Sequence, residues 1–99
     1  MNLYPFRVSY LLTEEKGLQI GVGAGKRHFK KAVHRNKIKR LLREAWRLQK
    51  NEVLEKANEQ QKGLAVFIVY IGKEMPSFSE ISTLVKQVID RLITFINKE

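Results

Sequence analysis

Ten basic side chains lie close together in one stretch of this 99-residue sequence, residues 26–47. The other 77 residues balance nine Lys or Arg against nine Asp or Glu, so the formal net charge of +9 belongs to these 22 residues. Glu44 is the only acid among them. Charge focused in this way indicates a polyanionic partner whose phosphates the cations contact. The ten are Lys26, Arg27, Lys30, Lys31, Arg35, Lys37, Lys39, Arg40, Arg43 and Arg47.

Side chains that could hydrolyse a phosphodiester are sparse. Such chemistry generally needs metal-holding carboxylates, an activated water or a pair of histidines. The basic stretch offers only Glu44, and His28 and His34 are not part of an H-E-x-x-H arrangement. We therefore expect a protein that is not catalytic alone, with both histidines as polar side chains near RNA.

Three uncharged side chains are further candidates for RNA contact. Asn36 could orient a phosphate-bound water or Mg²⁺, or it could simply cap a helix. Phe6 and Tyr10 share one face of a predicted strand and could stack on unpaired bases. A place in the core is the favoured alternative for Phe6, whereas the hydroxyl of Tyr10 suits a position with one wet end.

The basic stretch itself is predicted to be helical from about Lys31 or Arg35 onward. No Pro or Gly follows Arg35 within it, and most of its residues are good helix formers. A helix face that is merely solvated usually mixes charge signs, whereas this one carries no acid, so nucleic-acid contact is favoured. Trp46 is expected at the border, partly wet. At about 100° per residue the apolar side consists of Ile38, Leu41, Leu42, Ala45, Leu48 and Gln49, and the opposite basic face of Asn36, Lys39, Arg40, Arg43 and Arg47.

Apolar alternation predicts two strands before this helix, at about 6–12 and 18–24, joined as a hairpin by a polar turn. The second strand has glycine at alternate positions, Gly21, Gly23 and Gly25, which indicates close approach of another element or of a sugar-phosphate backbone. Neither the dinucleotide fingerprint nor the P-loop pattern fits these glycines.

The second half of the chain supplies the rest of the fold. The basic helix can continue, possibly kinked, and ends at Gly63 at the latest. Residues 64–71 are continuously apolar, which predicts a central strand covered on both faces. Ser77 and Glu80 have capping-box spacing before a second amphipathic helix. The order β-β-α-β-α predicts an α+β two-layer sandwich. The apolar residues of the last helix are Ile81, Leu84, Val85, Val88, Ile89, Leu92, Ile93 and Ile96.

Length and composition indicate one domain, residues 1–99, with enough apolar residues for a core. The absence of cysteine excludes disulfides and thiolate metal sites. No apolar run is long enough to span a membrane, and no export signal is recognised, so we expect a cytoplasmic protein.

Gly21, the pair Lys26-Arg27 and the run RNKIKRLLRE at residues 35–44 together resemble a sequence pattern of the protein subunit of bacterial ribonuclease P. The resemblance implies a small α/β sandwich, with a left-handed crossover, that binds the catalytic RNA and the single-stranded 5′ leader of precursor tRNA. It also implies that the RNA subunit holds the Mg²⁺ ions and cleaves, so this chain is an accessory subunit of an endoribonuclease that matures tRNA. The matching residues are Gly21, Lys26, Arg27, Ala32, the run from Arg35 to Leu41, Arg43 and Glu44.

Two departures from that family are visible. Its members usually carry a helix before the first strand, with aromatic residues facing the leader cleft, whereas residues 1–4 alone precede the strand here. Gly23 and Gly25 stand where β-formers are expected. We expect a monomer bound to RNA. A ribosomal or general RNA- or DNA-binding protein is the main alternative, and a free-standing nuclease the other.

Overall fold

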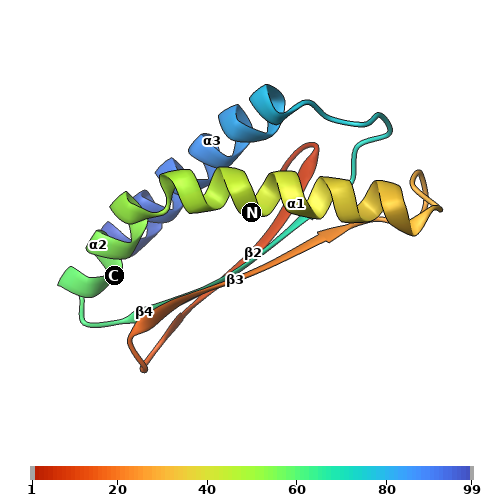
Figure 1. Ribbon diagram of the computed structural model, residues 1–99. Helices are drawn as coiled ribbons and strands as arrows, with labels where there is room; N and C mark the ends of the chain where they lie inside the picture. The colour runs from red at the N-terminus through yellow and green to blue at the C-terminus, as the bar shows by residue number, and fades with distance from the viewer. Residues whose placement is uncertain (1, 99) are drawn as a thin grey trace.

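Alternating apolar residues build one sheet, and amphipathic helices cover only one of its faces (Figure 1). The computed structural model describes residues 2–98. The two predicted layers are therefore present, with a further two-residue strand at the start that was not anticipated. In chain order the elements are β1 Asn2–Leu3, β2 Phe6–Thr13, β3 Gly17–Ala24, α1 Ala32–Gln49, α2 Asn51–Glu59, β4 Gly63–Tyr70 and α3 Phe78–Lys98.

The sheet order is β1-β2-β4-β3, so the predicted hairpin between the first two long strands is wrong. β4 lies between them, antiparallel to β2 and parallel to β3. The turn after β2 straddles the first residue of β4, with Thr13 and Gly17 both in register with Gly63. A side chain at Gly63 would collide with the carbonyl of Glu15 and the hydroxyl of Thr13. The turn is polar, as predicted, but it bridges two strand spacings instead of one.

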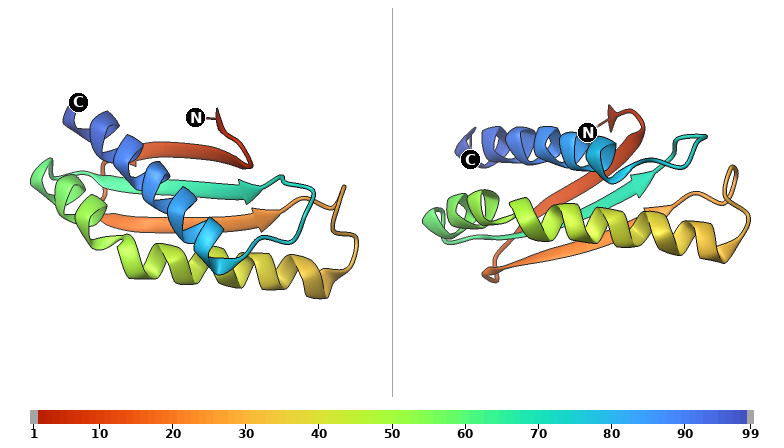
Figure 2. Two further views of the ribbon diagram at one scale, coloured as in Figure 1. Left: turned by 90° about the horizontal axis from the view of Figure 1, so that it is seen from above. Right: turned by 45° about the horizontal axis from the view of Figure 1, so that its top comes forward.

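The crossover from β3 through the helices to β4 is left-handed, as the family resemblance implied (Figure 2). Parallel crossovers are right-handed in nearly all folds. Two features of this chain account for the left-handed crossover. β4 must return toward β2 to fill the gap in the sheet, and the helices must cover the face that carries Val8 and Ile68, both almost fully buried.

The core lies between that face and the helices. Leu64, Val66, Ile68 and Tyr70 of β4 point into it and are buried. Ala65, Phe67 and Val69 alternate with them and point away; Phe67 is exposed, and Ala65 and Val69 are half-buried. The prediction that β4 is covered on both faces is therefore wrong, although its central position is confirmed. We call the uncovered side the open face. It carries Arg7, Ser9 and Leu11 of β2, Gln19, Gly21 and Gly23 of β3, and Ala65, Phe67 and Val69 of β4.

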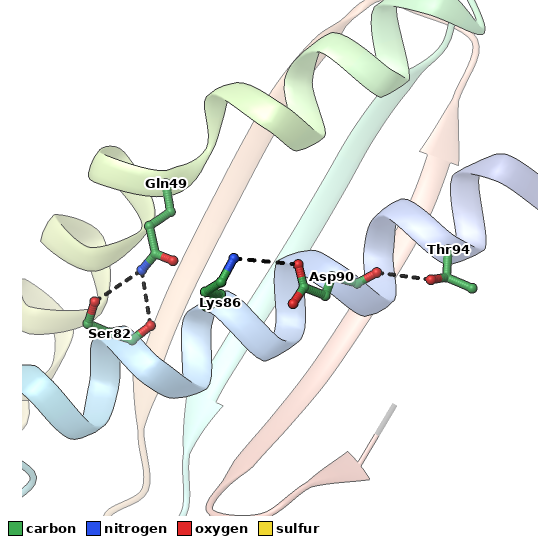
Figure 3. A network of polar contacts seen from close by, with 5 residues as sticks. All are labelled: Gln49, Ser82, Lys86, Asp90 and Thr94. Carbon is green, nitrogen blue, oxygen red and sulfur yellow. Dashed lines mark hydrogen bonds and ion pairs between the residues drawn. The ribbon is translucent and has the colours of Figure 1, made fainter.

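The helical layer is held by the predicted apolar stripes and a few polar contacts. The long helix breaks at Lys50, between α1 and α2, so its continuation past the basic stretch is interrupted at a position that the sequence did not indicate. The Ser77 hydroxyl accepts the N–H of Glu80 at 3.1 Å and so caps α3. Gln49 at the end of α1 donates to the carbonyl of Ser82 at 3.0 Å and to its hydroxyl at 3.2 Å, which ties α1 to α3 (Figure 3). Among residues 2–98, no helix is long and apolar enough to cross a membrane.

Candidate nucleic-acid interface

Helix α1 carries the predicted basic face, rotated slightly from its expected centre. Ile38, Leu42, Ala45 and Trp46 form the buried side. Trp46 is only 2% exposed, so its expected position at a wet border is wrong, and Leu48, expected on the apolar side, is 57% exposed. The buried stripe is centred nearer Trp46 than the sequence pattern indicated. On the opposite side Asn36, Lys37, Arg40, Arg43 and Arg47 are exposed, whereas Lys39 is half-buried at the border.

The cations of this face differ in whether they pair with another side chain of the protein. Lys37, Arg40 and Arg43 form no ion pair or side-chain hydrogen bond within the described residues 2–98. Arg47 instead holds Glu44 with both ends of its guanidinium, Nη2 to Oε1 at 2.5 Å and Nε to Oε2 at 3.2 Å. This hydrogen bond lowers the pKa of the Glu44 carboxyl. A phosphate at Arg47 must therefore compete with an intramolecular carboxylate.

Arg35 has a structural contact that the sequence did not indicate. Its Nη1 donates to the carbonyl oxygens of Phe29 at 2.8 Å and Lys30 at 2.7 Å. Phe29 is buried in the core. Arg35 therefore fixes the basic loop onto the start of α1, and only the rest of its guanidinium remains for a phosphate. An apolar residue in an otherwise polar loop, Phe29, was the available signal that this loop is anchored.

The anchored loop extends the basic surface beyond the helix. Its four cations, Lys26, Arg27, Lys30 and Lys31, are all exposed, and so are His28 and His34. Within residues 2–98 no three His, Cys, Asp or Glu side chains come together as a metal site.

Asn36 lies inside α1, exposed, and cannot be the cap. The N-cap of α1 is Lys31, five residues earlier. The capping alternative for Asn36 is therefore wrong, because a cap precedes the first turn. Its amide faces solvent next to the cations, which leaves the hypothesis of a water or Mg²⁺ contact open.

The two aromatic candidates for leader binding lie on the covered side of the sheet. Phe6 is 1% exposed and packs edge-on against Tyr70, with ring centroids 6.4 Å apart. It belongs to the core, as the favoured alternative predicted, and it cannot stack on a base, so it is no longer a candidate for the leader cleft. Tyr10 is half-buried, with its ring edge-on to Phe95 of α3 at 4.7 Å.

The open face carries an exposed aromatic that the sequence did not single out, Phe67. It is 48% exposed, beside Leu11 at 65%, over a shallow groove of about 420 Å³. The Phe67 ring lies directly over Gly21, where a Cβ would collide with it. Gly21 is thus explained by a side chain of the neighbouring strand, whereas a Cβ at Gly23 or Gly25 would meet only ordinary contacts, the nearest at 3.6 and 3.8 Å. The sequence did not indicate that Phe67 is exposed, because the continuous apolar run of β4 predicted a strand that is buried on both faces.

Comparison with known proteins identifies relatives for nearly the whole chain. The family model Ribonuclease P matches residues 1–93. The "Ribonuclease P protein component" of Porphyromonas gingivalis is 31% identical over 93 residues, covering 91% of this chain and 68% of the relative. The protein of the same name from Chlorobium phaeobacteroides is 33% identical over 97 residues, with 91% and 64% covered. No solved structure gives a significant match.

Proposed function

The chain belongs to the ribonuclease P protein family, and from this membership we propose that it is the protein component of ribonuclease P. In this role it binds the ribonuclease P RNA and precursor tRNA and supports removal of the 5′ leader. The exposed cations of α1 and of the preceding loop carry the proposal. Lys37, Arg40 and Arg43 have no internal partner in the described part of the chain, so their charges are available to phosphates.

The chain acts as an accessory subunit of an endoribonuclease. Hydrolysis and most of the Mg²⁺ binding fall to the RNA subunit, and the protein lowers the repulsion between RNA strands by supplying cations. It works as a monomer on RNA, in the cytoplasm. Asn36 is the residue of the basic face that could contact a hydrated Mg²⁺ held by that RNA.

We assign the leader to the open face of the sheet, in place of the Phe6 side. Single-stranded RNA binds sheets through exposed aromatic side chains, on which bases stack. Phe67 supplies such a ring on a groove of about 420 Å³, with Leu11 alongside. Arg7 lies on the same face, in the row next to Phe67, and provides a cation for the strand's backbone.

The function is tested by adding this protein to a cognate ribonuclease P RNA at low Mg²⁺ and measuring cleavage of precursor tRNA. The protein should restore cleavage that the RNA alone performs poorly under these conditions. Equal binding to any duplex, with no effect on cleavage, would identify a general nucleic-acid-binding protein. Divalent-dependent cleavage by the protein without RNA would identify a nuclease.

The leader surface is tested with Phe67→Ala, using Phe78→Ala as a matched control. Phe78 is also exposed, at 38%, but lies at the start of α3, away from the open face. Loss of one stacked base should weaken binding of leader-bearing tRNA by roughly 1–3 kcal/mol. Binding of tRNA without a leader should change little. Equal losses in both variants, or for both RNAs, would contradict this placement.

A further inference from the structure

A second cationic site lies outside α1, at the end of the sheet where β3 and β4 both finish, and includes Arg27 and His28 of the anchored loop. It is a pocket of about 230 Å³. Three chain segments form it: the start of β2, the loop after β3 and the loop after β4. Figure 1 shows both loops leaving the sheet at the same end. The carboxyl ends of parallel strands are where open α/β sheets commonly bind ligands.

The floor of this pocket is held by backbone hydrogen bonds between the three segments. The N–H of Gly25 donates to the carbonyl oxygen of Tyr70 at 3.1 Å, and the N–H of Ile71 donates to the carbonyl oxygen of Pro5 at 2.8 Å. The hydroxyl of Tyr70 is engaged as well, donating to the carbonyl of Glu74 at 2.7 Å. The three segments that form the pocket are therefore tied to one another at the end of the sheet.

The walls of the pocket are cationic. Arg7, Arg27 and His28 line it, and no acid does. Neither arginine forms an ion pair or a side-chain hydrogen bond within residues 2–98. Glu74 and Glu80 line a neighbouring pocket, which shares Tyr70 and Gly72 with this one.

The size and the charge together select the ligand. At about 230 Å³ the pocket is smaller than the usual site for a whole small-molecule ligand. It suits a phosphate group with part of a sugar. Arginine binds phosphate through a planar fork of N–H donors, and two unpaired forks from different segments can hold one group from two sides.

We propose that Arg7, Arg27 and His28 form a phosphate-binding pocket that holds one phosphodiester of an RNA strand at the end of the open face. The proposal rests on the proposed function and adds a site outside α1. Arg7 is the diagnostic residue, because it lies 19 positions before the basic stretch begins and joins it only through the fold. The phosphodiester belongs either to the leader of the substrate or to the ribonuclease P RNA.

The test uses Arg7→Gln and the double variant Arg7→Gln/His28→Gln in the full-length protein. Arg91→Gln is the control for Arg7→Gln, since Arg91 is an exposed arginine on α3 far along the chain from the pocket. Three dissociation constants are measured: protein with ribonuclease P RNA, and the assembled ribonucleoprotein with precursor tRNA and with leaderless tRNA. Loss of charged hydrogen bonds should weaken one of these by about tenfold.

Each outcome decides the proposal. Weakening confined to leader-bearing tRNA assigns the phosphate to the leader, and weakening of the protein–RNA complex assigns it to the catalytic RNA. No loss beyond that of Arg91→Gln overturns the pocket. Wild-type protein that fails to support cleavage in the same preparation would instead overturn the proposed function, so the two failures are distinguishable.

A leader assignment has a sharper check. Replacing single leader phosphodiesters by neutral methylphosphonates should locate one position that weakens wild-type binding about tenfold. The same replacement should have little further effect in Arg7→Gln, because the two changes remove one interaction. Additive losses at every leader position would overturn a specific phosphate contact.

Discussion

Replacing Arg40 and Arg43 together by alanine tests the basic face most directly. Both side chains are exposed and have no ion pair or side-chain hydrogen bond in residues 2–98. Each phosphate contact contributes about 0.7–0.9 to the slope of log K against log salt. The same counterion release contributes roughly 0.7–0.9 log units of affinity per contact at 0.1 M salt, so two lost contacts should weaken RNA binding about 30- to 60-fold.

The salt dependence gives a second readout. If about six cations of residues 26–47 meet phosphates, the wild-type slope should lie near −4 to −5, and the double variant should lie near −3. The free energy of unfolding, followed by thermal melting, should change by no more than about 1 kcal/mol, as for most surface sites.

A matched control separates the face from the total charge. Arg91→Ala/Lys98→Ala removes two exposed cations of α3, neither with an ion pair in residues 2–98, and the same formal charge. Equal losses of affinity in the two double variants would refute the reasoning, because net charge alone would then account for binding. A wild-type slope shallower than about −1 would refute phosphate contacts altogether.

Three further changes probe particular contacts. Glu44→Gln should free Arg47 and raise RNA affinity about two- to fivefold, as expected for an exposed ion pair, and titrations in an Arg47→Ala background should lose this gain. Because the hydrogen bond from Arg47 lowers the pKa of the exposed Glu44 carboxyl, the pair persists as pH falls through the ordinary Glu range. Protonation of Glu44 releases Arg47 only below that range, and the RNA affinity of the wild type should rise only at such low pH. Trp46→Ala should destabilise the fold by about 3–5 kcal/mol in denaturant unfolding, and the emission of wild-type Trp46, 2% exposed, should stay unchanged at RNA saturation. Ser77→Ala should cost about 1 kcal/mol through loss of the cap on Glu80, measured as a lower Tm that Ser77→Asp restores.

Local patterns predicted the elements well. The bounds of β2, β3 and α3 and the cap at Ser77 follow from periodicity and from short-range chemistry. These signals depend on residues within a few positions of one another. The basic face was predicted for the same reason, since its charges share one helix.

Pairing between distant segments could not be predicted in this way. Alternation of apolar and polar residues indicates the two faces of a strand but not the strands that pair with it. The position of β4 between β2 and β3 was therefore missed. The side of the sheet left open depends on which face the helices cover, so the exposure of Phe67 was missed, and Phe6 stayed a candidate for base stacking beside its favoured place in the core. Arg35 shows another limit: composition cannot tell a cation that meets phosphate from one that holds a loop carbonyl.

Strand β3 connects the two proposed RNA surfaces. It is the edge strand of the sheet, and α1 packs along it, beside α3 (Figure 2). On the other side of β3 is the open face, where Gly21 and Gly23 present no side chains of their own. An RNA assembly bound to α1 can therefore approach this edge closely, and a single strand can pass around it onto Phe67. Gly21, which leaves room for the Phe67 ring, thus lies between the two surfaces without a side chain of its own.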